Sequence, residues 1–237
     1  MADSIGRQRF DSVDRIITLS LILVVAASCK DSTAPTPVAT AVSVTSGSAQ
    51  TAVVGTSLAA PVVVKVTDQS GNALAGVAVM FSPSASSGSV SAAQVTTDAN
   101  GSAQVSWTLG TVAGSDSMTV TVGTLTPLAV VATAMPGAPA VLTIVSGNDQ
   151  TAPVDSTLSA VLAVKVADQY GNGVPNATVQ WSDDAGGTFA TATTVTDVNG
   201  IAQVGYTLGP AAGAEDVVAT LMNVATPMSA SFVEIGN

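Results

Sequence analysis

The stretch VKVTDQSGN, Val64–Asn72, returns 100 residues later as VKVADQYGN, Val164–Asn172. A repeat of this length indicates that a whole unit has been duplicated, because it is long enough to fold around its own core. Including the quoted stretch, 17 of 37 positions are identical between 46–82 and 146–182, and 12 of 18 between 97–114 and 196–213. The chain is therefore predicted to contain two tandem domains of one fold.

The composition and the spacing of apolar residues favour β-structure. Of the 237 residues, 47% are hydrophobic, but only 3% are aromatic and 9% are charged. Apolar and polar residues alternate in both copies, which is the pattern of half-buried strands. The positions expected to face inward are Val62, Val64, Val66, Val77, Val79, Phe81, Ala103, Val105, Trp107 and Leu109, with Val164, Val166, Ala177, Val179, Trp181, Ala202, Val204, Tyr206 and Leu208 in the second copy.

Turn residues separate these strands. Asn100-Gly101 and Asn199-Gly200 tolerate positive φ, and the aspartates two residues before each asparagine, Asp98 and Asp197, suit the capping of such turns. About seven short strands in roughly 95 residues are typical of an antiparallel β-sandwich. We predict an all-β chain of two such sandwiches, with Phe81, Trp107, Trp181 and Tyr206 packed between the sheets.

The N-terminus has the features of an export signal. Three arginines precede an apolar run, residues 16–27, which is too short for a membrane-spanning helix of ~20 residues. The run ends in Ser28-Cys29, which resembles the bacterial lipobox, where signal peptidase II cleaves before a diacylated cysteine. Cys29 is the only cysteine of the chain and has no disulfide partner. We predict cleavage after Ser28 and lipidation of Cys29; the alternatives are an ordinary secretory signal with an incidental cysteine, or an uncleaved anchor.

The predicted organisation has five parts. They are a lipoprotein signal peptide at 1–28, a flexible tether at 29–40, a first domain at 41–134, a short Pro-containing linker at 135–140, and a second domain at 141–237.

The repeated motifs resemble those of the bacterial Ig-like domain group 1, the repeat of invasin and intimin. The motifs that carry the resemblance are Val-x-Val-x-Asp-x-x-Gly-Asn from Val64, Val-x-Val-x-Phe from Val77, Thr-Asp-x-Asn-Gly-x-Ala from Thr97, and aromatic-Thr-Leu-Gly from Trp107. Their counterparts begin at Val164, Ala177, Thr196 and Tyr206. The resemblance implies Ig-like sandwiches used as surface-displayed stalks, often with adhesive tips.

Several classes of activity lack the residues they need. The chain has no histidine, and its single cysteine is assigned to lipidation, so we predict no catalytic residues and no cofactor. The net charge of −10 argues against nucleic acid as a partner. Asp68, Asp98, Asp168 and Asp197 offer oxygen atoms, but their spacing matches no calcium loop; we predict turn formation and no metal site, with calcium in the turns as the alternative.

The sequence predicts a lipid-anchored cell-surface protein of the outer membrane that acts in adhesion or as a structural spacer. Its partners would be the membrane, through the lipid on Cys29, and a protein or glycan ligand that the sequence does not identify. The alternative is a periplasm-facing glycan- or protein-binding module. In either case Tyr170, Asp183 and Asp184, expected in loops of the second domain, are the candidate contact surface.

Overall fold

The computed structural model describes residues 36–237, in which each copy of the repeat forms its own β-sandwich of ten strands and no helix occurs. The strands of the first sandwich are β1 (Ala39–Ser46), β2 (Gln50–Val53), β3 (Val62–Asp68), β4 (Ala78–Pro83), β5 (Ser89–Val90), β6 (Gln94–Thr96), β7 (Ser102–Val105), β8 (Trp107–Thr108), β9 (Gly114–Thr121) and β10 (Leu128–Met135). Those of the second are β11 (Val141–Ser146), β12 (Thr151–Ala152), β13 (Leu162–Ala167), β14 (Thr178–Asp183), β15 (Thr188–Phe189), β16 (Thr193–Val195), β17 (Ile201–Val204), β18 (Tyr206–Thr207), β19 (Gly213–Leu221) and β20 (Met228–Gly236). The predicted all-β class with two tandem sandwiches is confirmed.

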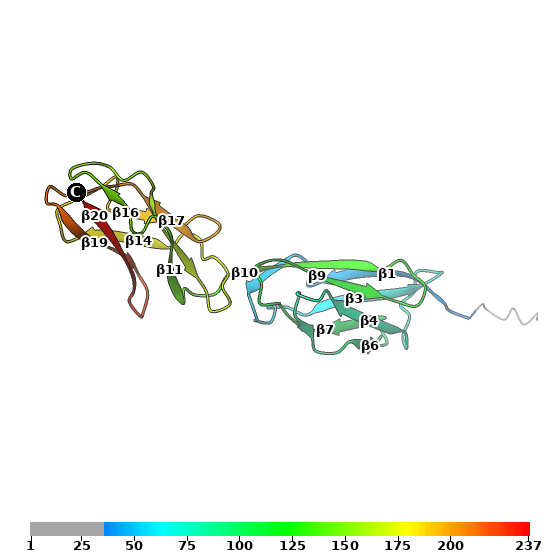
Figure 1. Ribbon diagram of the computed structural model, residues 1–237. Coiled ribbons are helices and arrows are strands. Elements are labelled where there is room, and N and C mark those ends of the chain that lie inside the picture. Colours follow the sequence, from blue (N-terminus) through cyan, green and yellow to red (C-terminus); the bar gives the residue numbers. More distant parts are fainter. Residues whose placement is uncertain (1–35) are drawn as a thin grey trace, which may run out of the picture. The chain divides into compact units, whose positions relative to one another are not determined.

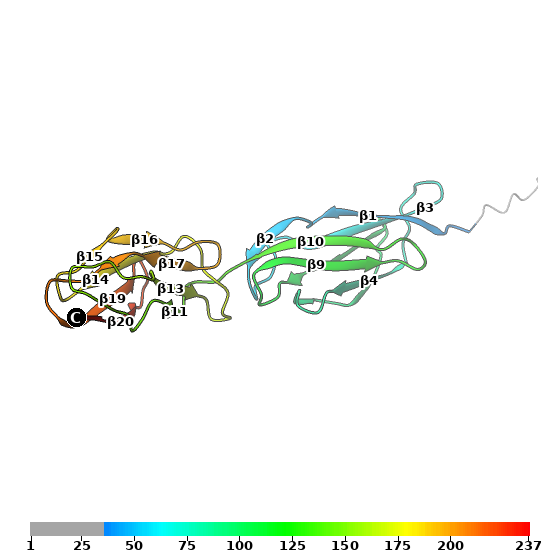
Figure 2. The same ribbon diagram turned by 45° about the horizontal axis from the view of Figure 1, so that its top comes forward.

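Each sandwich has a three-stranded and a five-stranded sheet. In the first, the orders are β1-β3-β7 and β2-β10-β9-β4-β6; in the second, they are β11-β13-β17 and β12-β20-β19-β14-β16. Figure 1 shows β14, β19 and β20 of the second sandwich, and Figure 2 shows β2, β10, β9 and β4 of the first lying side by side. Each also has a small two-stranded sheet, β5-β8 or β15-β18. Pairing is antiparallel except at β2–β10 and β12–β20, which are parallel.

The first strand of each sandwich crosses from one sheet to the other at a glycine. Gly47, between β1 and β2, has φ of +87°, and a Cβ there would collide with the carbonyl oxygen of Pro61. The side chain of Gln50 fixes this crossing, because its Nε2 donates to the carbonyls of Gly47 (2.9 Å) and Ala60 (2.8 Å) while its Oε1 accepts from the Ala60 N–H. Gln150 makes the same three bonds in the second sandwich.

The number of strands differs from the expected seven because long strands divide between sheets. The apolar residues of the alternating run from Ala103 to Leu109 all face inward, as predicted, but the strand breaks at Ser106. Its first half, β7, pairs with β3, whereas its second half, β8, pairs with β5. The first strand, β1, also begins at Ala39, two residues inside the segment expected to be tether.

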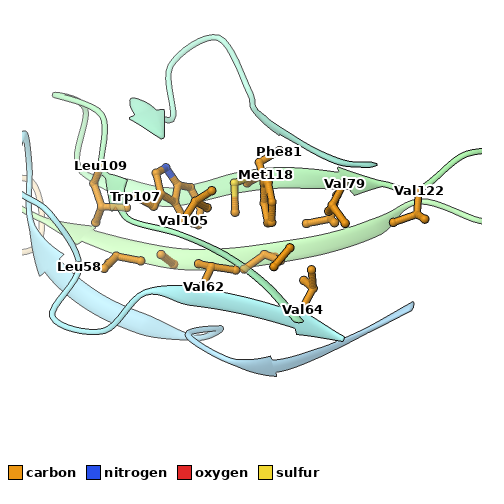
Figure 3. Close-up of a cluster of buried hydrophobic side chains, with 14 of the residues drawn as sticks. Leu58, Val62, Val64, Val79, Phe81, Val105, Trp107, Leu109, Met118 and Val122 are labelled. Carbon is orange, nitrogen blue, oxygen red and sulfur yellow. The ribbon is translucent and has the colours of Figure 1, made fainter. Parts of the chain in front are cut away.

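The side chains expected between the sheets form the cores. Phe81 and Trp107 are 1% and 0% exposed, and their counterparts Trp181 and Tyr206 are 3% and 1% exposed, so the predicted aromatic core positions are confirmed. Figure 3 shows Val62, on β3, pointing into the space between the sheets toward the side chains on the facing strands β4 and β9. The two clusters of buried residues share no member, so each sandwich has a core of its own.

Candidate functional site

The aspartates of the Asp-x-Asn-Gly motifs hold turns together. In the second sandwich the Oδ1 atom of Asp197 accepts from the backbone N–H groups of Asn199 (2.8 Å) and Ile201 (2.9 Å), and Asp98 makes the same pair of bonds in the first. The hydrogen bond from the Ile201 N–H is the main cause that lowers the pKa of Asp197 below its ordinary value. These carboxylates therefore complete their local turns, as the sequence predicts.

The aspartates of the Asp-x-x-Gly-Asn motifs have the same role. Asp168 is 1% exposed, and its oxygens accept from the N–H groups of Tyr170 (2.8 Å) and Asn172 (3.0 Å), from the Asn172 side chain (2.9 Å) and from the linker N–H of Gly137 (2.9 Å). Burial acts to raise the pKa of Asp168, but these hydrogen bonds outweigh it and hold the pKa below its ordinary value. Asp68 binds its own turn through three equivalent bonds.

The turns do not gather their carboxylates into a cation site. Within residues 36–237, no group of three or more acidic, histidine or cysteine side chains is arranged to hold a metal ion. Asp68, Asp98, Asp168 and Asp197 each direct oxygens to backbone N–H groups, which leaves fewer lone pairs for a cation that takes 6–8 oxygen ligands. The geometry supports the turn-forming interpretation of these residues.

The candidate contact residues lie at different ends of the second sandwich. Tyr170 is 47% exposed and occupies the turn that follows β13. Asp183 is the last residue of β14, which runs away from that turn for six residues, ~20 Å of extended strand. Asp183 Oδ1 accepts from the N–H groups of Ala185, Gly186 and Gly187, so this carboxylate caps its loop. The three residues do not form one surface.

Asp184, next in the chain, is exposed and links its loop to strand β19. Its Oδ1 accepts from the backbone N–H of Asp216 at 3.1 Å. Asp183 and Asp184 therefore lie at the same end of the sandwich as the start of β19, and both use a carboxylate oxygen for backbone contacts. This leaves Tyr170 as the exposed aromatic side chain of the candidate set.

Buried carboxylates within the sandwiches were not singled out as a site by the sequence. Asp116 in the first sandwich accepts from the N–H of Gly110 (2.9 Å), and its counterpart Glu215 accepts from the N–H of Gly209 (2.9 Å). Glu215 also accepts from the Tyr206 hydroxyl (2.9 Å), and burial, with this hydrogen bond, raises the pKa of Tyr206. Strand parity offered the signal, because Glu215 shares the inward face of β19 with the buried Val217 and Ala219.

Glu234 is a further buried carboxylate of the second sandwich. It is 0% exposed and pairs directly with Glu215 across β19 and β20. Its Oε2 accepts from the N–H of Gln150 (2.9 Å), whereas its Oε1 is buried without a hydrogen-bond partner. Burial raises the pKa of Glu234 to about 7.

The predicted signal peptide, its cleavage after Ser28, and the lipidated Cys29 lie outside the described residues. Within residues 36–237, no helix is long and apolar enough to cross a membrane.

Comparison with known proteins identifies the repeated unit. The sequence profile of the bacterial Ig-like domain (group 1) matches residues 48–134 and again residues 143–233. A search of curated protein sequences gave no match.

Solved structures share the sandwich fold at low sequence identity. Yersinia pseudotuberculosis InvD aligns with a TM-score of 0.57 and 20% identity, covering 79% of this chain and 55% of InvD. The Escherichia coli adhesin FdeC aligns with a TM-score of 0.46 and 22% identity, covering 84% of this chain and 66% of FdeC. The D0-D1 domain of intimin aligns with a TM-score of 0.32 and 19% identity, covering 83% of this chain and 98% of that fragment. This chain thus spans about half to two-thirds of the InvD and FdeC chains. The alignment with InvD supports the sandwich fold.

Proposed function

The chain belongs to the bacterial Ig-like domain (group 1) family, and from this premise we propose that it is an exported, lipid-anchored surface protein whose two sandwiches act in adhesion or as a structural spacer. The observation that carries the proposal is the match of the family profile to both copies, each with its own core. Modules of this family are used as surface stalks, and this organisation suits that use.

The side-chain chemistry favours the spacer role. Asp98, Asp183 and Asp197 bind backbone N–H groups of their own loops, and Tyr170 lies at the other end of its sandwich from Asp183. The candidate contact residues thus support local structure and do not converge on one face. We propose that the sandwiches carry no catalytic site and that any ligand contact is made through one end of a module.

The charge of the sandwiches favours attachment by lipid. Residues 36–237 hold two lysines against twelve acidic residues, a net charge of −10 (2 − 12). A protein of this charge is repelled by anionic headgroups and by nucleic acid. Membrane attachment is therefore proposed to depend on acyl chains at Cys29, with the outer membrane as the destination and the cell surface as the site of display.

The test is protease treatment of intact cells that express the wild-type chain or a Cys29→Ser variant, followed by immunoblotting. Digestion of the wild-type protein in intact cells, with a periplasmic marker protected, is the expected result. The Cys29→Ser protein should leave the membrane fraction. Protection until the outer membrane is broken would favour the periplasm-facing glycan- or protein-binding alternative. Unchanged membrane attachment of Cys29→Ser would refute lipid anchoring.

A further inference from the structure

The second sandwich contains two carboxylic acids that face one another where the first has only one. Glu215 and Glu234 are directly opposed on β19 and β20 and are 1% and 0% exposed. Side chains opposed in this way have Cβ atoms ~5 Å apart on the same face of a sheet. The equivalent pair in the first sandwich is Asp116 opposite Ala132, so this pair contains only one carboxylate.

The two carboxyl groups differ in the hydrogen bonds that they receive. Glu215 accepts from the Gly209 N–H through both oxygens, at 2.9 and 3.1 Å, and from the Tyr206 hydroxyl at 2.9 Å. Both oxygens of Glu215 therefore have hydrogen-bond donors from the protein. Glu234 receives one bond, from Gln150, and its Oε1 has none. An ionised Glu234 would leave a charged oxygen unsolvated in the core, whereas a protonated Glu234 would not.

Among residues 36–237, no cationic side chain compensates the pair. The charges that act on Glu234 come from Glu215 on β19 and from Asp149 in the segment before β12, and both are negative. The only lysine of the second sandwich, Lys165, directs its ammonium to the carbonyl of Gly171 at 3.4 Å. Like charges in a site with little water do not ionise together at the same pH.

From this geometry we propose that Glu234 is a proton-binding site, and that loss of its proton as the pH rises loosens the segment 148–152 against the end of β20. Glu234 holds this segment through the Gln150 N–H, and few other bonds help it. Toward β20 and the residue after it, they are Asp149 N–H to Val233 O (3.1 Å), Val233 N–H to the Asn148 side chain (2.9 Å), Ile235 N–H to Gln150 O (2.9 Å) and Asn237 N–H to Ala152 O (3.0 Å). The Gln150 side chain ties the segment instead to Gly147 and Ala160. The adjoining strand β12 has only two residues.

The sign of the effect follows from linkage. The pKa of Glu234 is raised to about 7 from an ordinary 4.5, mainly by burial, so the folded state holds the proton more tightly than an opened state. The stabilisation is fully present below pH 4.5 and declines as the pH rises to about 7, above which it is lost. For an opening that exposes Glu234 fully, these values correspond to a rise in the opening equilibrium of about tenfold between pH 6 and pH 8.

Hydrogen exchange of the full chain, read by mass spectrometry at pH 6 and pH 8, tests the proposal. After correction for the intrinsic pH dependence of exchange, peptides covering 148–153 should exchange about tenfold faster at pH 8. Peptides covering 48–53 in the same molecule are the control, because Ala132 replaces Glu234 beside them. A Glu234→Gln variant should lose the pH step, and Glu234→Ala, which copies the first sandwich, should lose it too.

Three results would overturn the proposal. One is the same pH response of hydrogen exchange in the peptides covering 148–153 and 48–53. Another is a pH step that persists in both Glu234→Gln and Glu234→Ala. The third is recovery of protection at pH 8 on addition of millimolar calcium, because it would mean that the carboxyl pair binds a cation and not a proton.

Discussion

Replacing Phe81 by alanine should unfold the first sandwich at much lower denaturant concentration and leave the second unchanged. Phe81 lies on β4, is 1% exposed, and belongs to the core cluster of the first sandwich alone. A buried Phe→Ala substitution costs about 3–5 kcal/mol, from lost apolar burial and from the cavity that remains. With a guanidinium dependence of about 3 kcal/mol per molar, the unfolding midpoint should fall by about 1–1.7 M.

The two tryptophans make the measurement specific to each sandwich. Trp107 lies in the first core and Trp181 in the second, and the chain has no other tryptophan. Equilibrium unfolding followed by fluorescence in a Trp181→Phe background reports the first sandwich, and a Trp107→Phe background reports the second. Phe81→Ala should shift only the Trp107 transition.

Met80→Ala is the matched control. Met80 precedes Phe81 on β4 but points to the opposite face and is 49% exposed. Its truncation should change the free energy of unfolding by less than about 0.5 kcal/mol. An equal shift of both tryptophan transitions by Phe81→Ala would refute independent cores, and equal effects of Phe81→Ala and Met80→Ala would refute the assignment of faces on β4.

Two further substitutions test the local structure. Gly47→Ala should destabilise the first sandwich by several kcal/mol, because positive φ and a collision with Pro61 act together; Gly76→Ala, with φ of +77° and open space around it, should cost only about 1 kcal/mol in thermal or chemical unfolding. Asp197→Asn should remove part of the pH dependence of stability. Because the folded pKa of Asp197 is lowered, its stabilisation is present above its unfolded pKa of about 3.9 and is lost as the pH falls through the folded value. Acid unfolding curves of the wild type and the variant should therefore converge at low pH, and a constant gap would contradict this account.

Local patterns in the sequence predicted much of the fold. Alternation placed Val62, Phe81 and Trp107 in the core, and the Asp-x-Asn-Gly motifs gave the turns held by Asp98 and Asp197. Both features depend on residues only a few positions apart. The breaks between β1 and β2 and between β7 and β8 were not predicted, since the sheet that each half joins is decided by partners far along the chain.

The candidate site was less predictable for the same reason. Tyr170 and Asp183 are close in sequence, but β14 carries the chain away from the turn of Tyr170 before Asp183 is reached. Conversely, Glu215 and Glu234 are 19 residues apart (234 − 215) and meet because β19 and β20 pair in a particular register. Charged residues are also usually exposed, so composition gives no reason to expect two of them in one core.

Comparison of the two copies indicates where the second sandwich acquired a property of its own. Residues that fix turns and the sheet crossing are the same in both, as at Gln50 and Gln150, with the same hydrogen bonds. The core differs around β8 and β18: the Trp107 indole donates to a backbone carbonyl, that of Ser87, whereas the Tyr206 hydroxyl donates to a carboxylate, that of Glu215. Tyr206 thus supplies a hydrogen bond to Glu215, and the charge of Glu215 is one of the causes that raise the pKa of Glu234. Tyr206→Phe, which removes only the hydroxyl, should weaken this coupling and lower the pH at which the 148–152 segment loosens.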